Sequence, residues 1–140
     1  MYKYEHNRTL STAASVQLVQ NMLYFRRFFP YYISNVVAGL DADGNGVVYS
    51  YDPIGHCSKS TYHAGGSSTS LIQPLLDNQV GLKNIENAER KELTKEDALK
   101  IVKDAFISAA ERDIYCGDGI SIKIVTAAGT ETQTFDLRKD

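Results

Sequence analysis

The sequence predicts an α+β fold in which antiparallel hairpins and helices occupy separate stretches of the chain. Near the C-terminus, Ile120, Ile122 and Ile124 alternate with other side chains, which is the period of a β-strand with one buried face. Residues 98–109 instead repeat apolar side chains at the period of an α-helix. Hairpins that are segregated from helices are typical of antiparallel sheets with helices on their outer faces, so we expect that arrangement.

The first half of the chain is expected to contain a helix followed by a hairpin. Ser11 is a suitable N-cap for a helix over residues 11–28, and Pro30 ends that run. The residues that follow are rich in β-branched and aromatic side chains, which favour strands. Aspartate, asparagine and glycine at residues 41–46 are typical of a hairpin turn. The expected strands cover residues 31–40, 46–52 and 59–64.

The second half is expected to contain two helices and a second hairpin. The glycine-serine turn at residues 65–68 opens the first of these helices, which Pro74 should kink or shorten. The second helix begins at Thr94, which forms a capping-box pattern with Asp97. A charged connection joins the two helices. The expected elements that remain are this connection at residues 81–93 and strands at residues 120–125 and 130–137.

Composition excludes several classes of function. A chain of 140 residues fits one domain, and its net charge of −2 gives no electrostatic case for nucleic acid or anionic lipid. No apolar run approaches the roughly 18 residues that a membrane span needs. Cys57 and Cys116 lie far apart in the sequence, which suits free thiols in a reducing compartment, with one disulfide between them as the alternative. The three histidines, His6, His56 and His63, lack the spacing of metal ligands, so no metal site is expected.

Residues 41–52 resemble the calcium loop of an EF-hand. They supply oxygen ligands at loop positions one, three and five, a glycine at position six and a carboxylate at position twelve. An EF-hand needs a helix on each side, however, whereas both flanks here are predicted to be strands, and Asp52 replaces the usual glutamate. A stand-alone calcium-binding module that uses loop 41–52 is kept as the alternative function. Helices on both sides of the loop would favour this module, and strands would count against it.

The turn at residues 65–68 has two interpretations. Glycine followed by serine before a helix can hold an anion on free N–H groups, or it can simply form a turn with a serine N-cap. An independent hydrolase that uses Ser67 is a weaker hypothesis, because no histidine stands at a suggestive distance from it. Nor do His56 and Cys57 suggest a nucleophile pair, since neighbouring residues in an extended segment point to opposite faces.

Several longer segments together resemble the β subunits of the proteasome, and in particular one of their non-catalytic types. Their residues are 26–32, 49–55, 64–67, 73–81, 106–113, 115, 117–118 and 137–140. The resemblance implies a four-layer αββα sandwich of the N-terminal nucleophile hydrolase type. The family's N-terminal strands and most of its first helix have no counterpart here. Residues 1–140 are therefore expected to be the C-terminal portion of one β-type domain, an incomplete sandwich.

The same resemblance implies that the chain is not an enzyme. Active β subunits attack the peptide carbonyl with an N-terminal threonine whose own amino group is the base, and that region has no counterpart in this sequence. Ser67 and Asp113 match two accessory positions of the family, whereas Cys116 stands where a serine is usual. We therefore expect no catalytic residue and no cofactor, with Ser67 and Asp113 as structural remnants.

The implied role is that of a structural subunit of the 20S core in ubiquitin-dependent protein degradation, in the cytoplasm and nucleus. Its partners would be other β subunits of the same ring, the opposite β ring and the α ring, with unfolded polypeptide substrates met only indirectly. Asp52, Pro53 and Ile54 would border the chymotrypsin-like site of the adjacent subunit. No contact with nucleic acid or membrane is implied.

Overall fold

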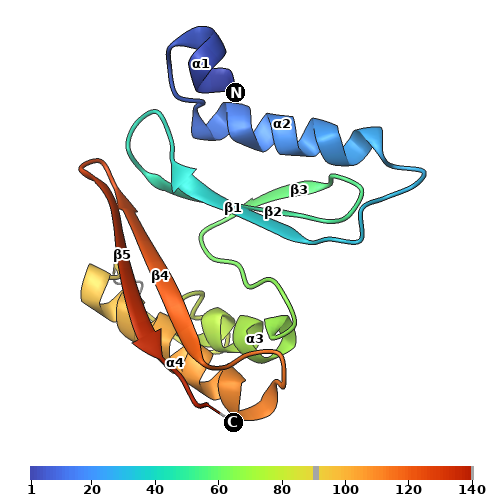
Figure 1. Cartoon of the computed structure of the whole chain (residues 1–140). Helices are drawn as coiled ribbons and strands as arrows, with labels where there is room; N and C mark the ends of the chain where they lie inside the picture. The colour runs from blue at the N-terminus through green and yellow to red at the C-terminus, as the bar shows by residue number, and fades with distance from the viewer. Residues whose placement is uncertain (90–91, 140) are drawn as a thin grey trace. The chain divides into compact units, whose positions relative to one another are not determined.

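The structure is a computed structural model that describes residues 1–89 and 92–139. The chain forms two compact units (Figure 1). Unit 1 comprises Met1–His63 with Val125–Thr130, and unit 2 comprises Ala64–Ile124 with Glu131–Asp140. Helices and antiparallel strands occur in separate runs of the chain, which confirms the predicted α+β class.

Unit 1 begins with two helices, of which the short α1 (Tyr2–His6) was not predicted. Helix α2 (Thr12–Phe25) starts as expected, because the Ser11 hydroxyl accepts a hydrogen bond from the Ala14 N–H at 3.2 Å. It ends three residues earlier than predicted. The N–H groups of Arg26 and Arg27 bond to carbonyls only three residues back, so the last turn tightens and the helix stops before Pro30.

The strands of unit 1 form an antiparallel sheet in the order β1-β2-β3. The predicted turn at 41–46 is present, and the Asp41 carboxylate accepts the N–H groups of Asp43 and Asn45 at 3.0 and 2.8 Å. Two predicted boundaries are wrong. The first strand begins at residue 35 instead of 31, opposite Tyr51, and the third is displaced toward the N-terminus because the β2–β3 turn is tight. The strands are β1 (Asn35–Leu40), β2 (Gly46–Tyr51) and β3 (Cys57–Ser60).

Helix α2 lies across the sheet and forms the core of unit 1 with it (Figure 1). Val16 and Leu23 on the helix pack against Tyr51, and all three are buried. The Tyr51 hydroxyl donates a hydrogen bond of 2.7 Å to the Val16 carbonyl. Burial raises the pKa of Tyr51 above its usual range, so the phenol stays protonated. The sheet is thereby fixed to the helix by one polar and several apolar contacts.

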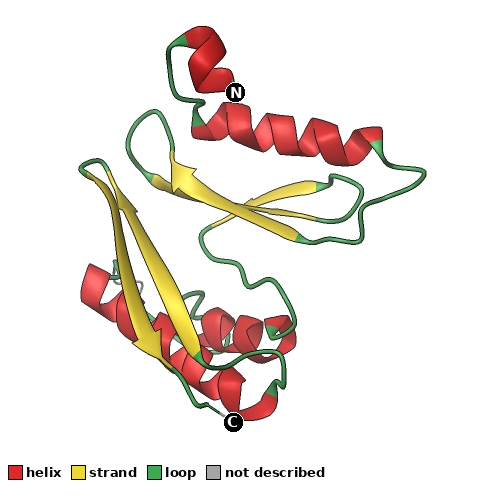
Figure 2. Ribbon diagram, in the orientation of Figure 1, coloured by secondary structure: helices red, strands yellow, loops and turns green. Residues whose placement is uncertain are grey.

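Unit 2 contains two helices, α3 (Thr69–Gln79) and α4 (Lys95–Arg112) (Figure 2). They pack through mostly small side chains. Helix α3 continues for five residues after Pro74, so Pro74 does not end the helix; only one backbone N–H is lost there. Helix α4 begins with the predicted capping box of Thr94 and Asp97. The core of the unit is formed by Ala64, Ile72, Ala105 and Ala109, with Leu75, Leu76 and Cys116 around it.

The predicted C-terminal hairpin is also present, as strands β4 (Gly119–Thr126) and β5 (Gly129–Asp136). Lys95 on α4 forms an ion pair of 2.7 Å with Glu131, and the Lys103 amine lies 3.6 Å from the ring centre of Phe135. Such exposed contacts contribute little stability individually, but together they hold β5 to α4. Within the described residues, none of the helices is both long and apolar enough to cross a membrane.

Candidate functional site

A serine-aspartate cluster connects the start of α3 to the end of α4 in unit 2. One carboxylate oxygen of Asp113 accepts hydrogen bonds from the hydroxyls of Ser67, at 2.6 Å, and Ser68. The other oxygen accepts the backbone N–H of Tyr115 at 2.9 Å. The two residues predicted as accessory positions, Ser67 and Asp113, therefore contact each other although they are 46 positions apart in the chain.

Local backbone structure positions each member of this cluster. Asp113 is the C-cap of α4, and its N–H bonds to the Ala109 carbonyl at 2.8 Å. Ser67 and Ser68 follow Gly66, which has a φ of +95° that favours glycine. Ser68 occupies the N-cap position of α3, but its side chain makes no capping bond there and donates to Asp113 instead. The predicted serine N-cap is thus right in position and wrong in its bond.

Sequence reasoning missed the contribution of Ser68. Ser68 is only 6% exposed, so its hydroxyl needs a hydrogen-bond partner inside the protein, and Asp113 provides one. No local pattern predicts this bond, because the two residues are 45 positions apart. The signal available in the sequence was a second serine beside Ser67 in the same turn.

The hydrogen bonds determine the charge of the cluster. The hydroxyl of Ser67, then that of Ser68 and then the N–H of Tyr115 lower the pKa of Asp113 below its ordinary value of 3.8, and burial opposes them weakly. Asp113 is therefore a carboxylate at neutral pH, and each of its two oxygens accepts at least one hydrogen bond. These bonds join the turn before α3 to the C-terminal end of α4.

Cys116 lies next to this cluster in sequence but belongs to the core of unit 2. Its N–H bonds to the Asp113 carbonyl at 3.2 Å, while the half-buried residue packs against Ala64, Ile72, Ala105 and Ala109. In the part of the chain that the structure describes, no hydrogen bond joins its thiol to Ser67 or Asp113. Both cysteines are free thiols.

Asp52, Pro53 and Ile54 lie together in the turn between β2 and β3 of unit 1. One carboxylate oxygen of Asp52 accepts the N–H groups of Ile54 at 3.1 Å and His56 at 2.7 Å. Gly55, at a φ of +90°, brings its backbone against the backbone of α2. Ile54 is 38% exposed beside Tyr24 at a shallow hollow, so its side chain is available for contact.

The calcium alternative is not supported by the structure of its loop. Residues 41–45 connect β1 to β2, so strands flank the loop where an EF-hand has helices. The backbone N–H of Asn45 is the main cause of a lowered pKa of Asp41, whose carboxylate is used to form the turn. His56 bonds to Ser58 at 3.2 Å. Within the described residues, no three acidic, histidine or cysteine side chains are grouped to hold a metal ion.

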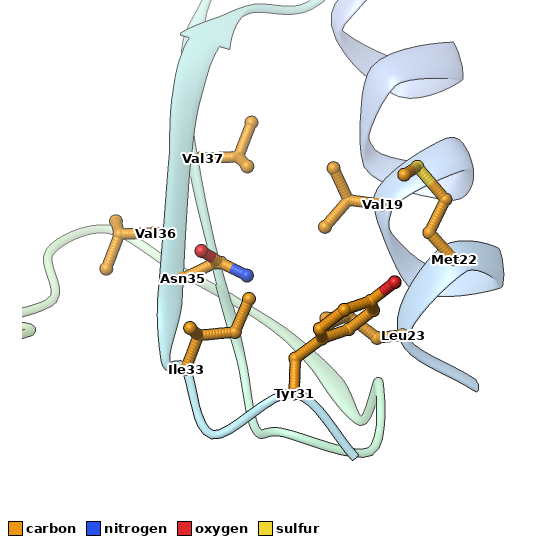
Figure 3. Close-up of a pocket in the computed structure, with 8 residues that line it drawn as sticks. All are labelled: Val19, Met22, Leu23, Tyr31, Ile33, Asn35, Val36 and Val37. Carbon is orange, nitrogen blue, oxygen red and sulfur yellow. The ribbon is translucent and has the colours of Figure 1, made fainter. Parts of the chain in front are cut away.

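An apolar hollow between α2 and β1 was not predicted (Figure 3). Its volume is about 350 Å³, and on one side Val37 of β1 faces Val19 of α2. Tyr31 closes the end where the chain enters the sheet. The remaining residues that line it are Met22, Leu23, Ile33, Asn35 and Val36. No local pattern in the sequence indicated the hollow, because its lining comes from two separate elements.

Comparison with known proteins identifies the family. The profile of the proteasome subunit family matches residues 1–125. The chain is 55% identical to proteasome subunit beta type-1 of Drosophila melanogaster, over 99% of this chain and 60% of that protein. It is 50% identical to proteasome subunit beta type-1 of Danio rerio, over 100% of this chain and 59% of that protein. It is 43% identical to proteasome subunit beta type-6 of Saccharomyces cerevisiae, over 99% of this chain and 61% of that protein.

The chain therefore spans about 60% of the length of the curated relatives that it matches. The family match runs from α1 into β4 and so includes residues of both units. The resemblance that the sequence motifs indicated is confirmed: the chain belongs to the proteasome subunit family.

Proposed function

We propose that the chain is a non-catalytic structural subunit of the 20S proteasome core that helps to assemble the β ring. The observation that carries this proposal is its 50–55% identity with beta type-1 subunits over 99–100% of the chain. The aligned region includes the helices, the strands and the turns between them, so the identity is not confined to one motif. The subunit would act in ubiquitin-dependent protein degradation, in the cytoplasm and the nucleus.

The geometry of unit 2 supports a role without catalysis. The carboxylate of Asp113 is engaged by two hydroxyls and one backbone N–H, so Ser67 and Asp113 serve to join α3 to α4. Cys116 contributes to the core beside them. The chain needs no cofactor for this role.

In the proposed assembly, residues 1–140 form the C-terminal portion of one β-type domain. The complete domain is a four-layer αββα sandwich, to which the helices and antiparallel strands of both units contribute. The partners are other β subunits of the same ring, the opposite β ring and the α ring. Unfolded polypeptide substrates bind to the catalytic β subunits beside this chain, so its contact with them is indirect.

The first test is assembly in cells of the source organism. An affinity tag on this chain should recover a complex of core-particle size that contains α-type and β-type subunits, as seen by native gel electrophoresis and mass spectrometry. Recovery of the chain only as free protein, or with no other proteasome subunit, would refute the proposal. Tagging a second β subunit and detecting this chain among its partners provides the reciprocal control.

The second test concerns the proposed contact with a neighbouring chymotrypsin-like site. Because Asp52 also holds its own turn, Asp52→Ala removes both a charge and two hydrogen bonds, whereas Asp52→Asn keeps an oxygen acceptor for Ile54 and His56. If the charge acts on the neighbour, both variants should change peptide preference at that site alone, measured with fluorogenic substrates on purified particles.

The other outcomes of this second test are equally informative. A change in Asp52→Ala but not in Asp52→Asn would attribute the effect to the shape of the turn. Equal loss at all active sites would indicate failed assembly. Unchanged kinetics in both variants would remove Asp52 from the neighbouring cleft.

A further inference from the structure

The segment that joins α2 to β1 exposes an unusual concentration of aromatic side chains. We call the residues 24–32 the aromatic surface. Phe28 and Tyr32 are 92% and 96% exposed, and Phe25 and Phe29 are 86% and 81% exposed. Aromatic side chains normally supply the core of a domain, so four of them in solvent within eight residues need a partner.

The area of this surface is sufficient for a protein interface. With about 200 Å² for each aromatic side chain, these four at their observed exposure offer roughly 700 Å². The largest apolar patch on an ordinary monomer is about 300–600 Å², whereas a stable interface buries about 800 Å² on each partner. The four side chains alone therefore account for most of one side of such an interface.

The aromatic surface continues into the hollow of Figure 3 through Tyr31, which belongs to both. Met22 and Ile33, which also line the hollow, are 57% and 46% exposed. An exposed apolar surface beside a hollow of about 350 Å³ offers a socket for one anchoring side chain of a partner. The hollow lies within unit 1, between α2 and β1.

Two arginines give the surface its charge. The guanidinium of Arg26 lies 5.3 Å from the ring centre of Tyr31, and that of Arg27 lies 5.4 Å from Phe28 and 5.9 Å from Tyr24. Stacking on ring faces leaves the N–H edges of a guanidinium available to acceptors. Among the residues that the structure describes, neither arginine forms an ion pair.

The charges also limit the kind of partner. Residues 24–36 contain two arginines and no acidic residue. A second copy of this chain, related by a twofold axis, would bring the same arginines together without a carboxylate between them. The net charge of −2 gives the whole chain no attraction to anionic lipid. A different protein with carboxylates around an apolar surface fits best.

We infer that the aromatic surface is the contact through which this chain binds another, non-identical folded subunit of its assembly, by an apolar patch rimmed with carboxylates. The inference rests on the proposed function and adds to it the location and chemistry of one contact. Phe28 and Phe29 provide apolar contact area, and Arg26 and Arg27 receive the carboxylates at the rim.

The experiment uses assembled particles from cells that express the chain with a photoreactive phenylalanine analogue in place of Phe28. Tyr4, which is 90% exposed on α1, receives the same analogue as the matched control. After irradiation, mass spectrometry of the cross-linked peptides should identify one segment of another proteasome subunit, with Asp or Glu near the cross-link, from Phe28 and not from Tyr4. Cross-links from Phe28 only to the same polypeptide, or only to lipid, would overturn the inference.

Charge reversal provides the second measurement. Arg26→Glu with Arg27→Glu should lower incorporation into particles by roughly tenfold, which is the effect of about 1.4 kcal/mol. Lys100→Glu with Lys123→Glu changes the net charge equally at exposed sites of unit 2 and should leave incorporation unchanged. Replacing the Asp or Glu that the cross-link identifies in the partner by arginine should restore incorporation of the chain that carries Arg26→Glu and Arg27→Glu.

Equal incorporation of both charge variants, or equal loss, would overturn the inference. Failure of the proposed function is recognised separately, because the unmodified tagged chain would then not enter particles at all. If the unmodified chain enters particles and Phe28 contacts no other subunit, the inference alone is refuted.

Discussion

Replacing Gly55 by alanine is expected to destabilise unit 1 by separating the β2–β3 turn from α2. Gly55 has a φ of +90°, and a Cβ atom there would lie 2.9 Å from the Gln20 carbonyl oxygen and 3.1 Å from the Tyr24 nitrogen. Both neighbours are backbone atoms of a helix, so they cannot move independently. The left-handed conformation costs alanine about 1–2 kcal/mol, and forcing extra volume into a packed contact costs about 1–3 kcal/mol more.

Gly44→Ala is the matched control for this prediction. Gly44 has a similar φ of +83°, but nothing lies within 4 Å of the position that its Cβ would take. Alanine at this position should therefore incur only the conformational cost of about 1–2 kcal/mol. The difference between the two variants isolates the contact of the β2–β3 turn with α2.

The assay combines urea denaturation, followed by circular dichroism, with hydrogen exchange of the α2 amides. Gly55→Ala should lose about 1–3 kcal/mol more than Gly44→Ala, and its faster exchange should be concentrated in α2. Equal losses in the two variants, or unchanged protection of α2 in Gly55→Ala, would refute the packing argument.

Three further changes test other contacts. Asp113 has a lowered pKa in the folded chain, so the unfolded chain binds more protons than the folded chain as pH falls through 3.8. The stability advantage of wild type over Asp113→Asn should therefore be full at neutral pH and disappear in acid, as measured by urea denaturation at a series of pH values. Thr94→Ala removes a capping box and should cost about 1 kcal/mol by thermal denaturation, whereas Ser108→Ala, within the same helix, should cost less. Tyr51→Phe removes the bond to the Val16 carbonyl and should cost about 0.5–1.5 kcal/mol, without loss of the fold in NMR spectra.

Elements that depend on nearby residues could be predicted from the sequence. Helix α4 begins where Thr94 and Asp97 complete a capping box, and this signal lies within four residues. The start of the first strand was wrong for the opposite reason. Residues 31–34 have the composition of a strand, but a strand needs a partner, and β2 ends at Tyr51, opposite Asn35. Pairing that is remote in sequence therefore decided this boundary.

The candidate site shows the same division between local and remote information. Similarity to a family indicated Ser67 and Asp113, and the structure brings them into contact. It gave no reason to include Ser68, whose bond to Asp113 depends on how α3 packs beside α4. The hollow between α2 and β1 could not be predicted either, because its lining comes from two elements whose contact depends on the fold.

The β2–β3 turn and the aromatic surface are connected through the C-terminal half of α2. Gly55 rests on the backbone of this helix at Gln20 and Tyr24, and Ile54 and Arg27 line one shallow hollow beside it. Arg27 also stacks on Phe28 within the aromatic surface. The turn therefore contacts the same end of α2 from which the aromatic surface continues. The two proposed protein contacts of unit 1 are consequently adjacent, because residues of both line the same hollow beside α2.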